Sequence, residues 1–399
     1  MSQNVIIVGA GIGGLTAAAV LLDRGHRVRV YEQAPALGEI GAGIQISANA
    51  SRVLHGLGLE DGLTKVAVIP TAQQFRVYST GELLHEIPLG TAHERGHGAK
   101  YYHLHRADLH AVLAAKVREL DPEAVVLRAA AESYTETRDS VTVKFANGTT
   151  ASGDLLIGAD GIKSAIRAQI LGATKAEFTN YVSWRATVPS SRLPPDYMER
   201  VSTNWMGPNA HVIVYYIRRG ELLNFVGLVE DDTWLDESWT VKAPWARLKV
   251  DFVPWHPKVQ MLIDAMDKDN CYRWAMYNRP PVTGWSTAHA TLLGDAAHPT
   301  LPFMAQGAAM AIEDGPIIAR ALEHESSMSA ALELYQRSRY ERTARVQIGS
   351  NEMGKLFHQR TEEDLRRGFE GRDLAKERNS WLFSYDPWTV PLGAPASGG

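Results

Sequence analysis

A cluster of glycines near the start of the chain forms a motif that can bind phosphate. Gly9, Gly11 and Gly14 match the pattern G-x-G-x-x-G, in which the glycines permit a tight turn, close approach of a pyrophosphate and close packing of helix on strand. The helix that follows would turn its free N–H groups toward the phosphates. Glu32 lies about eighteen residues beyond Gly14, where a carboxylate accepts hydrogen bonds from ribose hydroxyls. These residues predict a dinucleotide-binding site; the alternative is a glycine-rich turn without a ligand.

Two later segments place an acidic residue at the end of an expected strand. Asp160-Gly161 ends the apolar segment 154–159, and Asp295 ends the segment 288–294. Ligands of open α/β sheets bind at the carboxyl ends of the strands, where an acid can bond the polyol of a flavin ribityl chain. A helix expected over 305–322 would direct its N–H donors and positive dipole end at the anionic N1–C2 region of a reduced flavin.

A third group could handle a proton. On a strand, residues two apart share a face, so His211, Ile213 and Tyr215 should point the same way. His211 and Tyr215 would lie roughly 13 Å apart at about 3.3 Å per residue, and both could lean onto one ring-sized ligand. Histidine, with an ordinary pKa of about 6.5, suits removal of a phenolic proton. The alternative is a surface histidine and a core tyrosine on an ordinary strand.

The elements that must position these groups can be traced along the chain. Residues 5–8, 15–24 and 28–31 predict a β-α-β unit. The middle of the chain, over 71–86 and 181–229, alternates as strands do, with Arg218-Arg-Gly-Glu221 as a hairpin connection. Further elements are expected as follows: helices over 108–120, 305–322 and 329–347, and strands over 140–146, 154–159 and 288–294.

The fold class is therefore α/β, with a Rossmann-like dinucleotide domain assembled from distant segments. A mostly antiparallel β-sheet domain is inserted into it, and a helical, aromatic tail closes the chain. The boundaries we expect are residues 1–70, 101–178 and 283–350 for the dinucleotide domain, 71–100 and 179–282 for the inserted substrate-binding sheet, and 351–399 for the tail.

Composition narrows the function. The chain has 399 residues and a formal net charge of −4, so no basic excess favours nucleic-acid binding. A single cysteine excludes a disulfide framework, and the nearby histidines His103, His105 and His110 have no carboxylate or cysteine cluster to complete a metal site. No apolar window reaches the ~18 residues of a membrane helix, and no signal peptide is evident, so we expect a cytoplasmic protein that binds neither metal nor membrane.

Taken in order and spacing, these motifs resemble those of the class A flavoprotein aromatic hydroxylases, including the members that act on 3-hydroxybenzoate, 6-hydroxynicotinate and salicylate. The resemblance extends over nearly the whole chain, to about residue 347. It implies that the dinucleotide is FAD, with Glu32 at the adenosine ribose, Asp295 at the ribityl chain and Arg106 at the pyrophosphate. Asp160-Gly161 would serve both FAD and NAD(P)H. The full set of expected FAD contacts is Gly9, Gly11, Gly13, Gly14, Glu32, Gln33, Gly43, Arg106, Asp160, Gly161, Gly294, Asp295, Gly307 and Ala308.

The same resemblance implies that His211 and Tyr215 are the catalytic residues, yet the chain departs from the family at the substrate site. Pro302 stands where the 3-hydroxybenzoate enzymes have glutamine. Phe303 and Gln45 stand where the hydroxynicotinate enzymes have histidines. Arg185 and Arg76 are the candidates for gripping a substrate carboxylate. The substrate site is thus expected at Gln45, Arg185, Pro302 and Phe303, and its exact ligand stays open.

The resemblance further implies a reaction in which NADH or NADPH reduces FAD and a C4a-hydroperoxyflavin formed with O₂ hydroxylates a small hydroxylated aromatic or heteroaromatic carboxylic acid. A flavin-dependent oxidase or dehydrogenase is the alternative on the same fold. A non-catalytic dinucleotide-binding protein is the alternative from another class. A homodimer is one possible assembly.

Overall fold

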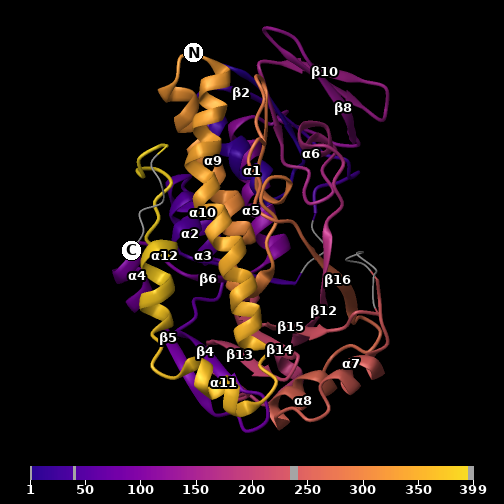
Figure 1. Cartoon of the computed structure of the whole chain (residues 1–399), viewed down its shortest axis with the longest axis vertical. Coiled ribbons are helices and arrows are strands. Elements are labelled where there is room, and N and C mark those ends of the chain that lie inside the picture. The colour runs from indigo at the N-terminus through magenta and orange to yellow at the C-terminus, as the bar shows by residue number, and fades with distance from the viewer. Residues whose placement is uncertain (1, 39–41, 234–240, 394–399) are drawn as a thin grey trace.

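The computed structural model describes residues 2–38, 42–233 and 241–393. Two large sheets dominate it: a parallel sheet in the upper half of Figure 1 and a longer sheet at the bottom, with the helix α10 (Met328–Phe357) running between them. The chain is a mixed α/β protein with C-terminal helices, as expected from the sequence.

The parallel sheet forms from short apolar segments that are far apart in the sequence. Its strand order is β17 (Ala290–Leu292), β11 (Leu155–Gly158), β1 (Asn4–Val8), β2 (Arg27–Tyr31) and β7 (Val125–Val126). Neighbouring strands all run parallel, so their carboxyl ends meet at one edge. The predicted β-α-β unit is confirmed, with helix α1 (Ile12–Asp23) between β1 and β2.

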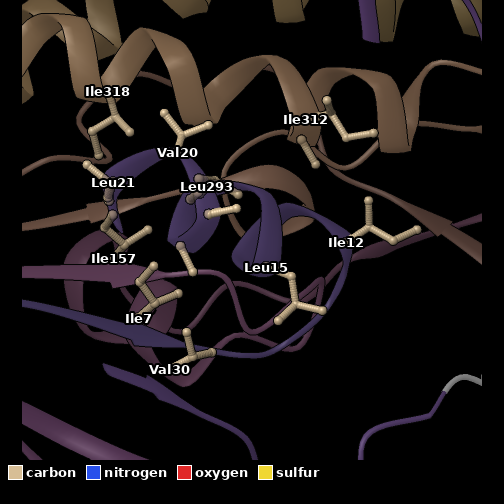
Figure 2. Packing of buried hydrophobic residues seen from close by; sticks show 14 of the residues in the cluster. Ile7, Ile12, Leu15, Val20, Leu21, Val30, Ile157, Leu293, Ile312 and Ile318 are labelled. Atoms are coloured by element: carbon tan, nitrogen blue, oxygen red, sulfur yellow. The ribbon is translucent and has the colours of Figure 1, made fainter. Parts of the chain in front are cut away.

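The core of this half lies where α1 packs between the sheet and helix α9 (Gly307–His324). Figure 2 shows Ile7 and Val30 from the sheet turned toward Leu15 of α1, while Ile312 and Ile318 approach from α9. All five side chains are fully buried. Burial of each such aliphatic side chain contributes about 1.5–3 kcal/mol to folding, so this packing fixes the glycine turn between β1 and α1.

The second sheet has seven strands. Their order is β16 (Tyr272–Asn278), β12 (Glu177–Pro189), β15 (Leu222–Glu230), β14 (Ala210–Ile217), β13 (Ser202–Gly207), β4 (Ala72–Val77) and β5 (Leu83–Pro88). Neighbouring strands are antiparallel except β13 and β4, which run parallel. The predicted hairpin is confirmed: β14 and β15 pair across a 3₁₀ turn at Arg218–Gly220, whose residues all have positive φ.

Smaller elements complete the fold. A three-stranded antiparallel sheet contains β10 (Thr150–Gly153), β9 (Val141–Phe145) and β8 (Ala131–Glu136), and β3 (Gly43–Ile46) pairs with β6 (Tyr102–His105). The remaining helices are α2 (Ala48–Gly56), α3 (Glu60–Thr64), α4 (Thr91–His97), α5 (Arg106–Leu120), α6 (Ala165–Leu171), α7 (Trp245–Asp251), α8 (Pro257–Asp264), α11 (Glu362–Phe369) and α12 (Ser380–Phe383).

Three expected boundaries were wrong. The strand predicted over 288–294 is only Ala290–Leu292, because the chain turns into a 3₁₀ helix at Gly294–Ala296. The helix predicted from residue 305 begins at Gly307, since Ala305 adopts a left-handed conformation with φ of +54°. The helix predicted to end at residue 347 continues to Phe357 through two glycines.

The aromatic tail packs on the body. The Arg342 guanidinium donates to the carbonyls of Trp381 and Leu382 (3.0 and 2.9 Å), and its centre lies 3.8 Å from the ring centroid of Tyr385. Arg52 donates to the carbonyl of Tyr385 at 2.6 Å. The tail thereby packs on α10 and α2.

Candidate active site

In the glycine turn the backbone packs so closely that two positions have no room for a side chain. Gly9 has a φ of +103°, and a Cβ there would lie 2.4 Å from the carbonyl oxygen of Ala159. A Cβ on Gly14 would lie 2.0 Å from the carbonyl oxygen of Gly9, a distance that real Cβ atoms do not reach. Both glycines are therefore required for the strand–helix packing itself.

Gly11 differs from its neighbours. A Cβ on Gly13 would lie 2.7 Å from Cδ2 of Leu293, whereas a Cβ on Gly11 would meet nothing within 4 Å. Gly11 borders open space at the start of α1, where the first N–H groups of the helix have no partners within the helix. The missing side chain at Gly11 thus leaves room for a ligand rather than for protein.

Glu32 ends β2 beside this turn. Its Oε2 accepts the backbone N–H of Ala10 at 2.8 Å and its Oε1 accepts that of Ala34 at 2.9 Å. The carboxylate is fixed in place and each oxygen retains a lone pair for a further donor. Gln33, next to it, is exposed.

A cavity of about 280 Å³ opens where β1, β11 and β17 end, and it extends to one face of the seven-stranded sheet. The sequence-predicted residues that line it are Gly11, Gly13, Gly14, Gly43, Gln45, Arg106, Gly161, Arg185, Tyr215, Gly294, Asp295, Pro302, Gly307 and Ala308. Those outside its lining are Gly9, Glu32, Gln33, Asp160, His211 and Phe303. The fold therefore brings together segments that span nearly three hundred residues of sequence.

Charged groups face one another across this cavity. Asp295 is exposed and lines the cavity, and desolvation by the surrounding protein raises the pKa of its carboxyl, against the opposing effect of Arg106. Burial lowers the pKa of the Arg106 guanidinium, while Asp295 acts in the other direction. Burial also lowers the pKa of Arg185 to about 10, with Tyr215 opposing the shift and Arg106 adding to it. Both arginines remain cationic at neutral pH, so the cavity favours anionic ligands.

Arg185 is held in place by an aromatic neighbour. It lies on β12 opposite Val226 of β15, which also lines the cavity. The centre of its guanidinium is 4.9 Å from the ring centroid of Trp274, a cation–π contact that keeps the group over the sheet.

Tyr215 lines the cavity from β14, at a point where the backbone of β3 comes very close. A Cβ on Gly43 would lie 2.7 Å from the Tyr215 hydroxyl, and the Gly43 N–H donates to Oδ1 of Asn224 at 2.6 Å. Burial raises the pKa of the Tyr215 phenol, so it remains a neutral hydrogen-bond donor. Gln45, also in the lining, accepts the Tyr101 hydroxyl at 2.7 Å.

His211 lies near the start of β14, outside the cavity lining. Its ring is fully buried and packs against Phe303 and Phe357, with both ring centroids 5.3 Å away. Its Nδ1 lies 2.6 Å from Nε2 of His358, the residue that follows α10. Phe303 thus occupies the end of the site where His211 is found, and Pro302 beside it forms the cavity wall.

Asp160 and Arg167 link two of the glycine-acid segments. Oδ2 of Asp160 accepts the N–H of Ala165 at 2.8 Å at the start of α6. Arg167, on the same helix, donates to the carbonyls of Ala296 and Ala297 at 2.6 and 3.0 Å. Helix α6 therefore holds the turn that carries Asp295.

A buried ionic network, which the sequence analysis missed, stands behind this turn. Asp314 accepts the Gly294 N–H at 2.9 Å and pairs with Arg339 at 2.7 Å, while Glu313 pairs with Arg342 at 2.6 Å. All four charged side chains are buried. Burial favours the neutral acid, but His298 and Arg339 outweigh it and lower the pKa of Asp314 to about 2. The network fixes the first turns of α9 against the cavity.

Helix α10 also holds the cavity wall, through residues without a recognisable motif. Gln347 donates to the carbonyl of Pro299 at 2.8 Å, and the Ser350 hydroxyl donates to that of Leu301 at 2.6 Å. These bonds fix the backbone on either side of Thr300. Nothing in the sequence marked these two residues as part of the site, and the apolar spacing predicted only the helix that carries them.

Three further expectations concerned Arg76, metal binding and membrane helices. Arg76 donates to Oε1 of Gln74 and to the carbonyl of Gly81, and it does not line the cavity. Within the described ranges, no cluster of three or more metal-ligating side chains occurs. In those ranges no helix is long and apolar enough to cross a membrane.

Comparison with known proteins identifies the family of the protein that carries this cavity. Residues 2–349 match the FAD binding domain family. The chain is 36% identical to 6-hydroxynicotinate 3-monooxygenase of Pseudomonas fluorescens, over 99% of this chain and 98% of that protein. It is 37% identical to 3-hydroxybenzoate 6-hydroxylase of Polaromonas naphthalenivorans, over 97% and 98%. The chain belongs to the FAD-dependent aromatic hydroxylases.

Solved structures agree with this family. A salicylate hydroxylase substrate complex superimposes with a TM-score of 0.83 at 26% identity, covering 97% of this chain and 96% of that one. Klebsiella pneumoniae HpxO, complexed with FAD and uric acid, also gives a TM-score of 0.83, at 27% identity over 96% of each chain. The protein is a flavoprotein monooxygenase whose cofactor is FAD, as the sequence motifs predicted.

Proposed function

We propose that this enzyme uses NADH or NADPH and O₂ to hydroxylate a small hydroxylated aromatic or heteroaromatic carboxylic acid. One observation carries the proposal: two half-buried arginines and a buried tyrosine share a single cavity with the glycine turn and the acid at the end of β17. Such a cavity suits a dinucleotide and an anionic aromatic ring side by side.

The residues fit FAD. The open space at Gly11 and the first N–H groups of α1 suit the pyrophosphate, with Arg106 as its counter-charge. Glu32 is placed for the adenosine ribose and Asp295 for the ribityl chain. The N-terminus of α9, at Gly307, would face the flavin ring. When bound, FAD supplies hydride acceptance from NAD(P)H and the activation of oxygen.

In this proposal the domain that holds FAD is Rossmann-like, and the seven-stranded sheet is an insertion that supplies the substrate site. Asp160-Gly161, beside the cavity, would contact both FAD and the transient NAD(P)H. The parallel order of β17, β11, β1, β2 and β7 and the separate pairing of β12–β16 support this division.

The substrate would lie against the sheet. Arg185 would bind its carboxylate through two parallel hydrogen bonds, with Ile213 and Val226 against the ring. Tyr215 would donate to the substrate oxygen or orient the ring. His211 would accept the phenolic proton, which makes the ring more nucleophilic. Because Phe303 lies against His211, its ring must turn aside when the substrate enters.

The relatives suggest the substrate class. Hydroxybenzoates and hydroxylated pyridine carboxylates combine a ring hydroxyl with a carboxylate, as the two cationic side chains and the buried base require. Pro302 replaces a glutamine, and Phe303 and Gln45 replace histidines that ionise, so fewer polar groups surround the ring and a benzene ring fits this site better than a pyridine. The apolar residues of the lining, among them Ile213, Val226 and Leu293, would exclude water from the reacting centre.

The experiment that tests this function measures NAD(P)H oxidation by the purified yellow protein across hydroxybenzoates and hydroxypyridine carboxylates. O₂ consumption, hydroxylated product and H₂O₂ are counted together, since uncoupled turnover mimics a substrate. Equal amounts of NAD(P)H consumed and hydroxylated acid formed support the proposal. Substrate oxidation without NAD(P)H would instead favour an oxidase or dehydrogenase, and loss of flavin absorbance would favour a non-catalytic protein.

A further inference from the structure

Three side chains form a hydrogen-bonded chain from the buried end of β14 to the surface. Nδ1 of His211 lies 2.6 Å from Nε2 of His358, and Nδ1 of His358 lies 3.1 Å from Oε1 of Glu230. The two histidine rings are buried, while the Glu230 side chain is 41% exposed. These hydrogen bonds join three parts of the fold that are distant in sequence: β14, the end of α10 and the end of β15.

The positions of the protons follow from what each atom can do. A carboxylate only accepts, so Nδ1 of His358 must carry the proton toward Glu230. A neutral imidazole has one N–H, so Nε2 of His358 accepts from Nδ1–H of His211. Nε2 of His211 is then a lone pair, and among the described residues it has no hydrogen-bond partner. Burial lowers the pKa of both rings, which supports the neutral forms.

Apart from this hydrogen-bonded chain, the described side chains packed against the two histidine rings are aromatic. Phe303 and Phe357 flank His211, and Tyr181 on β12 lies 5.2 Å, centroid to centroid, from His358. Burial raises the pKa of the Tyr181 phenol, so it stays neutral. The charged groups near the outer end are Glu230 itself and Arg360, whose charge helps His358 lower the pKa of Glu230.

We propose that His358 and Glu230 form a proton-exit route for His211, a proposal that rests on the function proposed above. The substrate O–H bond breaks and its proton goes to Nε2 of His211. The proton on Nδ1 of His211 passes to Nε2 of His358, and the proton on Nδ1 of His358 passes to the Glu230 carboxylate, which releases it to water. Entry of a proton in the reverse direction, onto the product oxygen, restores both tautomers. His358 and Glu230 are thus positioning and relay residues, and of these three side chains only His211 would touch the substrate.

A purely structural role is the rival, since His358 also ties the end of α10 to β14. The tautomers and the hydrogen bond between the two rings are tested without turnover, by ¹⁵N NMR of the holoenzyme labelled at histidine. The variants His211→Gln and His358→Gln assign the signals. The expected spectrum places the proton on Nδ1 in both rings and gives a ¹⁵N–¹⁵N coupling across the bond between them. A proton on Nε2 of His211, or no coupling, would overturn the proposal.

Glu230→Gln tests the outer end, because glutamine keeps an oxygen that accepts from His358 but is not basic. Glu177→Gln, at an exposed position on β12, is the matched control. With 3-hydroxybenzoate and 6-hydroxynicotinate as probes, stopped-flow absorbance follows phenolate formation on binding. We expect a rate at least about tenfold lower in E230Q, with a larger solvent isotope effect and unchanged FAD content. Equal rates in E230Q and E177Q would contradict the relay.

Chemical rescue tests the central histidine. His358→Gly should lower kcat about 100-fold with little change in KM. Added imidazole should restore turnover, whereas pyrazole, similar in shape but far less basic, should not. Rescue by both would show that His358 only fills space. Failure of every compound to be hydroxylated would refute the proposed function, while the NMR coupling still decides the relay on its own.

Discussion

Two glycines of the same turn should fail for different reasons when each is changed to alanine. The Cβ of Gly14→Ala would lie 2.0 Å from the Gly9 carbonyl oxygen, whereas that of Gly11→Ala would meet no protein atom within 4 Å. Relief of the first contact requires a backbone shift of about 1 Å in a packed core, which costs about 3 kcal/mol or more. The second substitution costs the fold at most about 1 kcal/mol, at the N-cap of α1.

These costs predict different thermal shifts. Unfolding entropy near 60 °C is about 2.1 cal/mol/K per residue, or about 0.8 kcal/mol/K for this chain, so Gly14→Ala should lower the Tm of the apoprotein by about 4 °C. Gly11→Ala should leave the apoprotein Tm within about 1 °C of the parent. If its methyl group weakens FAD binding 100-fold, FAD at saturating concentration stabilises it by about 2.7 kcal/mol less than the parent.

Differential scanning calorimetry of the apoproteins, followed by FAD titration, separates the two effects. Gly11→Ala should fold normally and bind FAD poorly, and Gly14→Ala should be unstable before any FAD is added. Normal FAD affinity in Gly11→Ala would refute the placement of the pyrophosphate at this turn. An unchanged apoprotein Tm in Gly14→Ala would show that the turn can relax.

Three further predictions concern charge. Arg185→Gln should weaken binding of the aromatic acid about 10- to 100-fold, because a charged hydrogen bond is lost, and flavin absorbance should be retained. The control Arg76→Gln should have no effect. Equal effects of the two substitutions in equilibrium titrations would show that Arg185 does not bind the substrate. Burial lowers the pKa of His103 to about 3, from about 6.5 in the unfolded chain. Its contribution to the free energy of unfolding is therefore complete above pH 6.5 and decreases as the pH falls, with a loss of about 2 kcal/mol at pH 5. Urea titrations at pH 7 and pH 5 should show that His103→Phe flattens this dependence, and an unaltered slope would contradict it. Arg342→Met should cost about 3–5 kcal/mol in the same assay, because the buried Glu313 and Asp314 would then share Arg339 alone. Addition of Glu313→Gln should recover part of the loss, whereas no recovery would argue against the pair.

Much of the fold could be predicted because its signals are local. The glycine turn, α1 and β2 lie within about thirty consecutive residues, and the hairpin between β14 and β15 follows from alternation and a turn. The end of α10 could not be predicted, because Gly349 and Gly354 normally weaken a helix. A Cβ on Gly354 would lie 2.7 Å from the Phe303 ring, so tertiary packing requires the glycine and supplies the stability that it lacks locally.

The candidate site divides in the same way. Residues that approach the cavity from strand ends, such as Asp295 and Gly161, follow from the geometry of parallel sheets. Glu313 and Arg342 are 29 residues apart on two helices, and in sequence they look like ordinary solvated charges. His358 lies 147 residues from the histidine that it contacts, so no spacing rule connects them. Such pairs become visible only once the helices are in place.

The length of α10 has a mechanical consequence. Thirty residues at about 1.5 Å each make an unbroken rod of about 45 Å, and Figure 1 shows it extending from beside the parallel sheet to the seven-stranded sheet. Arg339 and Arg342, near its middle, anchor it to α9, and just past its C-terminal end His358 lies against His211 of β14. A rod tied to α9 at its middle and to β14 at its end resists movement of the two halves relative to each other. We therefore expect reactants to enter and leave through movements of single side chains and short loops while α10 stays in place.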